Sequence, residues 1–338
     1  MTRASDVAKI LKQPFTNTLG TSNYRAGVNA GDSIASGGNY NVAIGDEAGT
    51  AITTGDHNTA IGFSALDAED GGTASVAIGN YALSAQNADG NNYNTAVGYV
   101  AGSDITTGIE NTIIGGLAGD ALSDADYNTI VGTRALGSDT KGSRSTAIGY
   151  SALSTQNFSS STNANNTAVG FFAGVGVTTG SSNTLIGAEA GNDISTGNSN
   201  TVIGAKAGEE MTTADDCVYV GMLAGGGNAS SATTGHDNVA IGSSALAVST
   251  SAHSNVAIGF EALKANTTGG ESTVIGYQAG LANTEGRITA VGRHAVKTNT
   301  TGTSTTGIGY RALRDSTGAH NTALGNDAGY QISSGQSN

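Results

Sequence analysis

The stretch Asn-Val-Ala-Ile-Gly-Asp-Glu-Ala-Gly, residues 41–49, is the first clear copy of a motif that recurs along the chain. Seventeen copies align on the glycine that follows the short apolar run. Successive glycines are mostly 17 residues apart, with intervals of 16 twice, 19 once and 21 twice. Ile, Val or Leu precedes this glycine in every copy, and Ala follows three residues later in every copy. Such regularity indicates a repeat protein, in which each unit packs on its neighbours.

The motif itself indicates β-structure. Its Thr/Val-Ala-Ile run alternates with a period of two and is rich in β-branched residues, as a half-buried strand should be. The glycine that follows permits a sharp bend, and a second turn signal, such as Thr53-Thr54-Gly55 or Thr106-Thr107-Gly108, comes about ten residues later. A 17-residue unit with two turns is too short for a helical repeat. The sequence therefore predicts an all-β fold, a parallel β-solenoid rod of about 17 coils.

The scarce aliphatic residues suggest where the core lies. We expect the residue before each glycine to be buried at the same place in successive coils, and the Asn that opens many copies to stack into a hydrogen-bonded ladder. The predicted repeat core is Ile44, Ile61, Ile78, Val97, Ile114, Val131, Ile148, Val169, Ile186, Ile203, Val220, Ile241, Ile258, Ile275, Val291, Ile308 and Leu324. Because this apolar supply is thin for an isolated rod, we also expect a homotrimer.

Composition excludes several classes of protein. The net charge is −13 and only 12% of the residues are charged, with 52 Gly, one Pro and no Trp. No basic stripe is available for nucleic acid, no apolar run is long enough to span a membrane, and no apolar segment of a Sec signal peptide is visible. Cys217 is the only cysteine. It replaces the usual Asn and is predicted to be a small buried residue rather than part of a disulfide.

Some copies resemble known families. Asn41–Gly45, Ser75–Gly79 and Asn255–Gly259 are similar to the head repeats of YadA-type trimeric autotransporter adhesins. That resemblance implies a trimeric left-handed β-roll. Asn94–Tyr99 and Asn166–Phe171, together with the opening residues Met1–Ala8, resemble the tail-fibre and structural proteins of marine tailed phages, especially cyanophages.

The second resemblance implies a structural virion fibre that supports host attachment. We therefore expect the protein on the surface of an extracellular particle, made in the host cytoplasm. Residues 1–38 precede the regular repeat and are predicted to be either an adaptor to other virion proteins or a solenoid cap. A short helix is expected there, capped by Ser5 and ended before Pro14. Residues 39–338 form the predicted solenoid domain.

Three longer intervals indicate inserted loops at Gln86–Asn92, Asn157–Asn165 and Gly225–His236, and they recur every four copies. Loops on a rigid scaffold are free to vary and can carry recognition, although neutral insertion explains them equally well. A host-surface glycan or receptor is the expected partner. The candidate recognition residues are Asn87, Asn91, Tyr93, Asn157, Phe158, Asn163, Asn228 and His236.

No residues form a recognisable catalytic constellation, so the chain is predicted not to be an enzyme and to need no cofactor or metal. Acidic clusters such as Asp67 with Glu69 and Asp70 could bind Ca²⁺, but solvated charge explains them better. Aromatic residues follow the glycine in seven copies; they could bind glycans, but sealing a coil corner or a chain interface is the favoured interpretation. The alternative functions are a bacterial trimeric adhesin head and, less favoured, an ice-binding solenoid suggested by the Thr-Thr-Gly turns.

Overall fold

The computed structural model describes residues 20–226 and 232–332. Within these ranges it is an all-β parallel solenoid of about 17 turns, as predicted, with strands and turns but no helix. Accordingly, the described ranges contain no helix long and apolar enough to cross a membrane. The chain divides into two compact units, which are described separately. The first comprises residues 20–143 and Ser159–Ser161, and the second comprises Arg144–Phe158 and residues 162–332.

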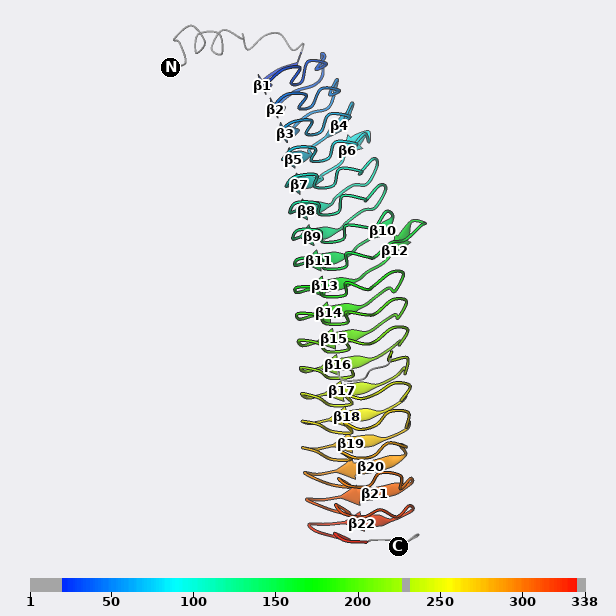
Figure 1. Cartoon of the computed structure of the whole chain (residues 1–338). Helices are drawn as coiled ribbons and strands as arrows, with labels where there is room; N and C mark the ends of the chain where they lie inside the picture. The colour runs from blue at the N-terminus through cyan, green and yellow to red at the C-terminus, as the bar shows by residue number, and fades with distance from the viewer. Residues whose placement is uncertain (1–19, 227–231, 333–338) are drawn as a thin grey trace, which may run out of the picture. The chain divides into compact units, whose positions relative to one another are not determined.

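The first unit stacks short strands in one parallel sheet (Figure 1). Equivalent residues of successive coils face each other, so Ile44 pairs with Ile61 and Ile61 pairs with Ile78. The main-sheet strands are β1 (Tyr24–Ala26), β2 (Val42–Ile44), β3 (Thr59–Ile61), β5 (Val76–Ile78), β7 (Thr95–Val97), β8 (Thr112–Ile114) and β9 (Thr129–Val131). The shorter strands are β4 (Gly72–Thr73), which pairs with β6 (Gly90–Asn91), and β10 (Gly142–Ser143).

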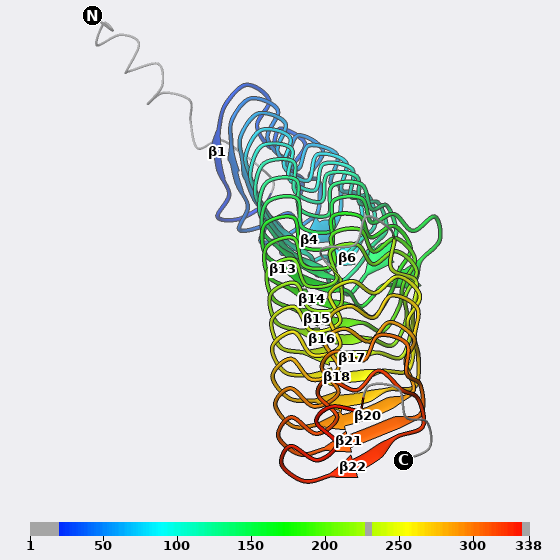
Figure 2. The same cartoon turned by 60° about the horizontal axis from the view of Figure 1, so that its bottom comes forward.

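The second unit repeats this arrangement, and Figure 2 shows β13 to β18 one below another in chain order. Its main-sheet strands are β11 (Thr146–Ile148), β13 (Thr167–Val169), β14 (Thr184–Ile186), β15 (Thr201–Ile203), β16 (Val218–Val220), β17 (Val239–Ile241), β18 (Val256–Ile258), β19 (Thr273–Ile275), β20 (Ile288–Val291), β21 (Thr305–Ile308) and β22 (Thr322–Leu324). β12 (Thr162–Asn163) lies in the longer loop that follows β11. Because the strands pair in register, each side chain of a main-sheet strand lies next to the equivalent side chain of the neighbouring coil.

The solenoid begins earlier than residue 39. Strand β1 pairs in parallel with β2, Tyr24 opposite Val42 and Ala26 opposite Ile44. Ala30 and Ile34 are buried at the positions that Ala48 and Ile52 occupy in the next coil. The predicted boundary between residues 38 and 39 is therefore wrong, because residues 20–38 form a coil that lacks the aliphatic residue of the motif. The helix predicted near Ser5 lies outside the described residues.

The interior of the coil is lined by the middle residue of each strand and by the Ala that follows the glycine. Ala43, Ala48, Ala60 and Ala65 are fully buried in this way. In a three-residue strand the first and third side chains share one side and the middle one points to the other. The middle residue, which ranges from Ala43 to Leu185 and Tyr219, therefore lies inside the coil, and the first and third residues lie outside.

The predicted repeat core is consequently wrong in its orientation. The aliphatic residues before the glycines stack in register, but on the outside of the chain; Ile114 is 41% exposed and Ile148 is 37% exposed. The exposed members are Ile114, Ile148, Ile186, Ile203, Ile241, Ile275, Ile308 and Leu324, and the half-buried members are Ile44, Ile61, Ile78, Val97, Val131, Val169, Val220, Ile258 and Val291.

Two kinds of coil fill the interior differently. In one kind the interior Ala is followed by Gly, and a large apolar side chain three residues further on fills the space, as Ile52 does beside Gly49. In the other kind the Ala is followed by Leu, and a polar residue takes the later position, as in Leu246 with Ser249. In most of the described coils these two positions together hold one large side chain, whereas Gly280 and Asn283 hold none and Ile288 approaches Gly280 instead.

A ladder of asparagines closes the coil, as predicted. Asn183 is fully buried; its Oδ1 accepts a hydrogen bond from the backbone N–H of Asn200 at 3.0 Å, and its Nδ2 donates to the carbonyl of Gly197 at 2.8 Å. Asn41 makes the same pair of hydrogen bonds with Gly55 and Asn58 of the next coil along the chain. Cys217 occupies this ladder position and is buried, which confirms its predicted environment. The ladder satisfies turn groups that would otherwise be buried without partners.

The glycine of the motif is required by close approach between coils. Gly45 has φ +125°, and a Cβ there would lie 2.6 Å from the carbonyl oxygen of Gly62 in the next coil. Any side chain would push the coils apart at this bend. The bend therefore fixes where the chain leaves the sheet and exposes the two residues that follow it.

Candidate functional site

The outer sheet face is the most uniform surface of each unit. We define it as the first and third residues of the main-sheet strands from β2 to β22, excluding Ile288 and Thr305, which precede the paired positions of β20 and β21. Thr or Val occupies the first position, and Ile, Val or Leu occupies the third. None of these residues is charged, in a chain whose net charge is −13. Both units therefore carry parallel rows of β-branched side chains that present no charge to a partner.

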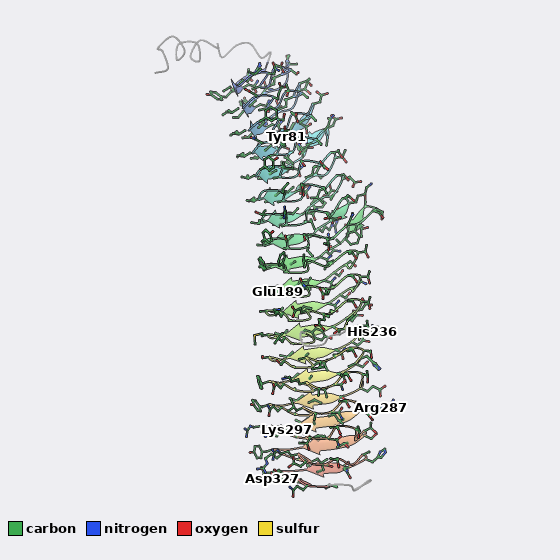
Figure 3. The ribbon with its side chains drawn as sticks, viewed as in Figure 1. Tyr81, Glu189, His236, Arg287, Lys297 and Asp327 are labelled. Atoms are coloured by element: carbon green, nitrogen blue, oxygen red, sulfur yellow. The ribbon has the colours of Figure 1, made fainter. Side chains whose placement is uncertain are left out.

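A second surface, the post-glycine edge, consists of the first two residues after each motif glycine. Figure 3 places Glu189 and Asp327 along this edge of the second unit and Lys297 on the same side, with His236 and Arg287 along the opposite edge. Aromatic residues of the edge stack between coils: the ring centroids of Tyr150 and Phe171 lie 5.7 Å apart.

The aromatic residues that follow the glycines are exposed rather than sealed into the coil. Tyr99 is 59% exposed and Tyr310 is 39% exposed, and the others fall between these values. The interpretation that they seal a coil corner does not describe the single chain. They stand on the post-glycine edge, where they are available to a ligand or to another chain.

The last coils of the second unit combine these aromatic residues with arginines. The guanidinium carbon of Arg293 lies 5.5 Å from the ring centroid of Tyr277 and 5.8 Å from that of Tyr310. Arg311 lies 5.5 Å from the Tyr310 ring and 4.3 Å from the Tyr330 ring, and Arg314 Nη1 donates to the Tyr330 hydroxyl. Cation–π contacts of this kind hold guanidinium planes over ring faces.

The electrostatic potential around these arginines is positive, as the side chain of His294 shows. Burial lowers the pKa of the His294 imidazole, and the neighbouring Lys297, Arg293, Arg314 and Arg311 lower it further. Two carboxylates offset these cations in part: Asp327 Oδ1 is 3.2 Å from Arg311 Nε, and Asp315 Oδ2 is 3.7 Å from Arg314 Nη1.

All but one of the described candidate recognition residues are exposed. Asn87, Asn91 and Tyr93 are exposed in the first unit, with Tyr93 at 55%. In the second unit Asn157, Asn163 and His236 are exposed, but Phe158 is only 7% exposed and belongs to the interior. Phe158 is thus not a surface contact, because it fills the space under its own loop. Asn228 lies outside the described residues.

A buried carboxylate anchors the first of these loops. Glu69 accepts hydrogen bonds from Gly72 N at 2.7 Å, from Gln86 Nε2 at 2.8 Å and from Asn92 Nδ2 at 3.0 Å. Desolvation raises the pKa of Glu69, although these donors act in the opposite direction. Gln86 also donates to Ser75 Oγ, which replaces a ladder Asn. In the second unit Gln156 donates to Ser145 in the same way, as expected of a duplicated block of coils.

The acidic clusters do not assemble a metal site. Among the residues that the structure describes, no group of three or more His, Cys, Asp or Glu side chains is arranged to hold a metal ion. Glu209 is paired instead with Lys206 at 2.8 Å, and Glu189 approaches the same lysine at 3.0 Å. Hydrogen bonds to these two carboxylates raise the pKa of Lys206.

Comparisons with protein-family models, with curated proteins and with solved structures each find no match to this chain. The class of protein rests on the fold, a parallel β-solenoid of stacked short coils. Its surfaces are the outer sheet face, the post-glycine edge and the inserted loops.

Proposed function

We propose that the chain is a structural fibre protein of a tailed-phage particle, in which three copies associate through the outer sheet face and support attachment to a host. The observation that carries the proposal is the uncharged outer sheet face. Molecules with a net charge of −13 repel each other, so a face without charge is where copies can approach. The resemblance of the motif to trimeric adhesin heads supports three copies. Its resemblance to phage fibre proteins supports a location on a virus particle.

The regular spacing of the outer sheet face argues for a second copy as its partner. Its rows of Thr, Val and Ile repeat once per coil, about every 4.8 Å along a parallel sheet. A partner that packs against every row must have the same spacing, and another copy of this solenoid has it. Association would cover the Ile and Val side chains that are exposed in the single chain, as obligate homo-oligomers cover theirs.

The test of association is the mass of the purified chain by light scattering, with Ile186→Asp as the variant. Ile186 is 38% exposed, so the charge leaves the coil interior intact and the variant should fold. We expect a trimer for the native chain and a monomer for Ile186→Asp. Thr196→Asp, which places the same charge on an exposed turn, is the control and should remain trimeric. A monomeric native chain, or an unchanged mass for Ile186→Asp, would refute association through this face.

The setting is tested separately, by immunogold imaging of the source culture. Label on the appendages of virus particles supports the fibre. Label on the surface of bacterial cells instead would support the alternative, a trimeric adhesin head, which the similarity of Asn41–Gly45 to adhesin head repeats favours.

A further inference from the structure

The strongest unexplained feature of the surface is an arginine–tyrosine patch at the end of the second unit. It consists of Tyr277, Arg293, Tyr310, Arg311, Arg314 and Tyr330. We propose that this patch binds an acidic polysaccharide, through guanidinium groups that engage its carboxylate or sulfate groups. As a host-recognition surface it rests on the fibre function proposed above, whereas its binding chemistry belongs to the chain alone.

The charge of the patch is local and unusual for this chain. Arg293, Lys297, Arg311 and Arg314 surround His294 on a protein of net charge −13. Asp327 and Asp315 are ion-paired with two of these arginines, and Glu261 interacts with Lys297. Among the described residues Arg293 has no carboxylate partner, and it is exposed. Its Nη1 donates a long hydrogen bond to the Tyr310 hydroxyl at 3.4 Å. A guanidinium without a carboxylate partner can offer its other N–H groups to a planar or tetrahedral anion.

The aromatic rings determine how the arginines are presented. Arg293 lies between the rings of Tyr277 and Tyr310, which come from the coils on either side of its own. The side chain is therefore held over ring faces before any ligand arrives, so that less rotamer entropy is lost on binding. The register of the solenoid sets the distance from Arg293 to Arg311, one coil further on. Anions repeated along a polymer can contact both arginines at once.

The same geometry argues against a nucleic acid as the ligand. Single-stranded nucleic acids use open aromatic faces on which bases stack, but here arginines cover faces of Tyr277 and Tyr310. The positive region is also short, since Glu261 precedes it along the edge and Asp327 follows it.

The test is direct binding of the full chain to defined polymers by biolayer interferometry at fixed salt concentration. The probes are polygalacturonate for carboxylates, dextran sulfate for sulfates, uncharged dextran as a blank, and oligo(dT) as a nucleic acid. We expect binding to at least one acidic polysaccharide and none to dextran. The stronger of the two acidic probes identifies the anion.

Three variants locate the binding. Arg293→Gln should weaken binding about tenfold, the loss of one charge-assisted hydrogen bond. Arg287→Gln removes the same charge from the opposite edge and should change affinity less than about twofold (Figure 3). Asp327→Asn frees Arg311 from its ion pair and should strengthen binding.

The proposal is overturned if neither acidic polysaccharide binds, if oligo(dT) binds as tightly, or if Arg287→Gln and Arg293→Gln weaken binding equally. These outcomes are independent of the particle imaging, so failure of the patch and failure of the fibre function are distinguishable.

Discussion

Residues 49 and 52 fill one shared space inside their coil, and this gives a quantitative prediction for the stability of variants at the two positions. Gly49 has φ +56°, and a Cβ there would lie 2.8 Å from Ile52 Cδ1. Gly49→Leu alone therefore adds an overpacking cost of about 1–3 kcal/mol to a left-handed backbone cost of about 1–2 kcal/mol. Ile52→Ser alone removes a fully buried side chain and should cost about 2–5 kcal/mol.

Together the two changes convert this coil into the kind that Leu246 and Ser249 already form, where Leu246 has φ +53°. The new leucine then fills the space that Ile52 leaves. We expect the double variant to lose only about 1–2 kcal/mol, the residual left-handed cost. The favourable coupling between the sites is then about 3–8 kcal/mol, the sum of the overpacking and cavity costs that the double variant avoids.

The measurement is urea unfolding followed by circular dichroism, with hydrogen exchange of the β2 and β3 amides to show that the coil is retained. Ala51→Ser, a half-buried neighbour on the same turn, is the control and should change stability by less than about 0.5 kcal/mol. If the two single effects simply add, the idea that the positions share one volume is wrong.

Two further predictions concern buried polar groups. Asn183→Ala removes the partners of Asn200 N–H and of the Gly197 carbonyl, and should destabilise the chain by about 2–6 kcal/mol, whereas Asn192→Ala, outside the ladder, should have little effect in the same urea assay. Because desolvation raises the pKa of Glu69, its protonation favours the folded state; that contribution is fully present below the unfolded value of 4.5 and is lost as pH rises through the folded pKa. The stability of the native chain should therefore fall as the pH rises above 4.5, and Glu69→Gln should reduce the fall. Thermal unfolding that shows the same pH dependence in both proteins would contradict this assignment.

The fold could be predicted from the sequence because the repeat determines the register. Once Ile44, Ile61 and Ile78 are known to be equivalent, parallel pairing at those positions follows, and so does the stacking of Asn41 on Asn58. The boundary at residue 39 was missed because Tyr24–Ala26 lacks the aliphatic signal, although it pairs as a strand with β2.

The orientation of the strands could not be predicted from apolar character alone. In Thr59-Ala60-Ile61 the largest apolar residue is Ile61, and the rule that large apolar residues lie inside points to it. The structure buries Ala60 instead, because the middle residue of the strand points to the opposite side from Ile61. Position in the strand decides this, and not size, since Leu185 and Tyr219 are buried at the equivalent middle position. The decisive clue was the Gly or Leu after the interior Ala, together with the residue three positions later.

Some features of the candidate sites could be predicted from the sequence, and others could not. Exposure of Asn87 and Tyr93 followed from the insertion, but burial of Phe158 did not, because an aromatic residue in a loop gives no indication of the side it faces. The arginine–tyrosine patch was detectable in principle. Tyr277, Arg293 and Tyr310 are separated by 16 and 17 residues, the repeat interval, so in-register stacking alone brings them together.

The outer sheet face and the post-glycine edge tolerate different residues. The proposed association and the proposed ligand binding can therefore change independently. A charge anywhere on the outer sheet face would meet its counterparts above and below at the same register, as well as any partner chain, so that face stays uncharged along both units. On the post-glycine edge, a residue such as Glu189, Tyr277 or Arg293 faces solvent and affects only its immediate neighbours. The edge can therefore change from acidic to aromatic to basic between coils without altering the fold. A chain built this way can acquire a new ligand at one coil while the outer sheet face, through which we propose that copies associate, is unchanged.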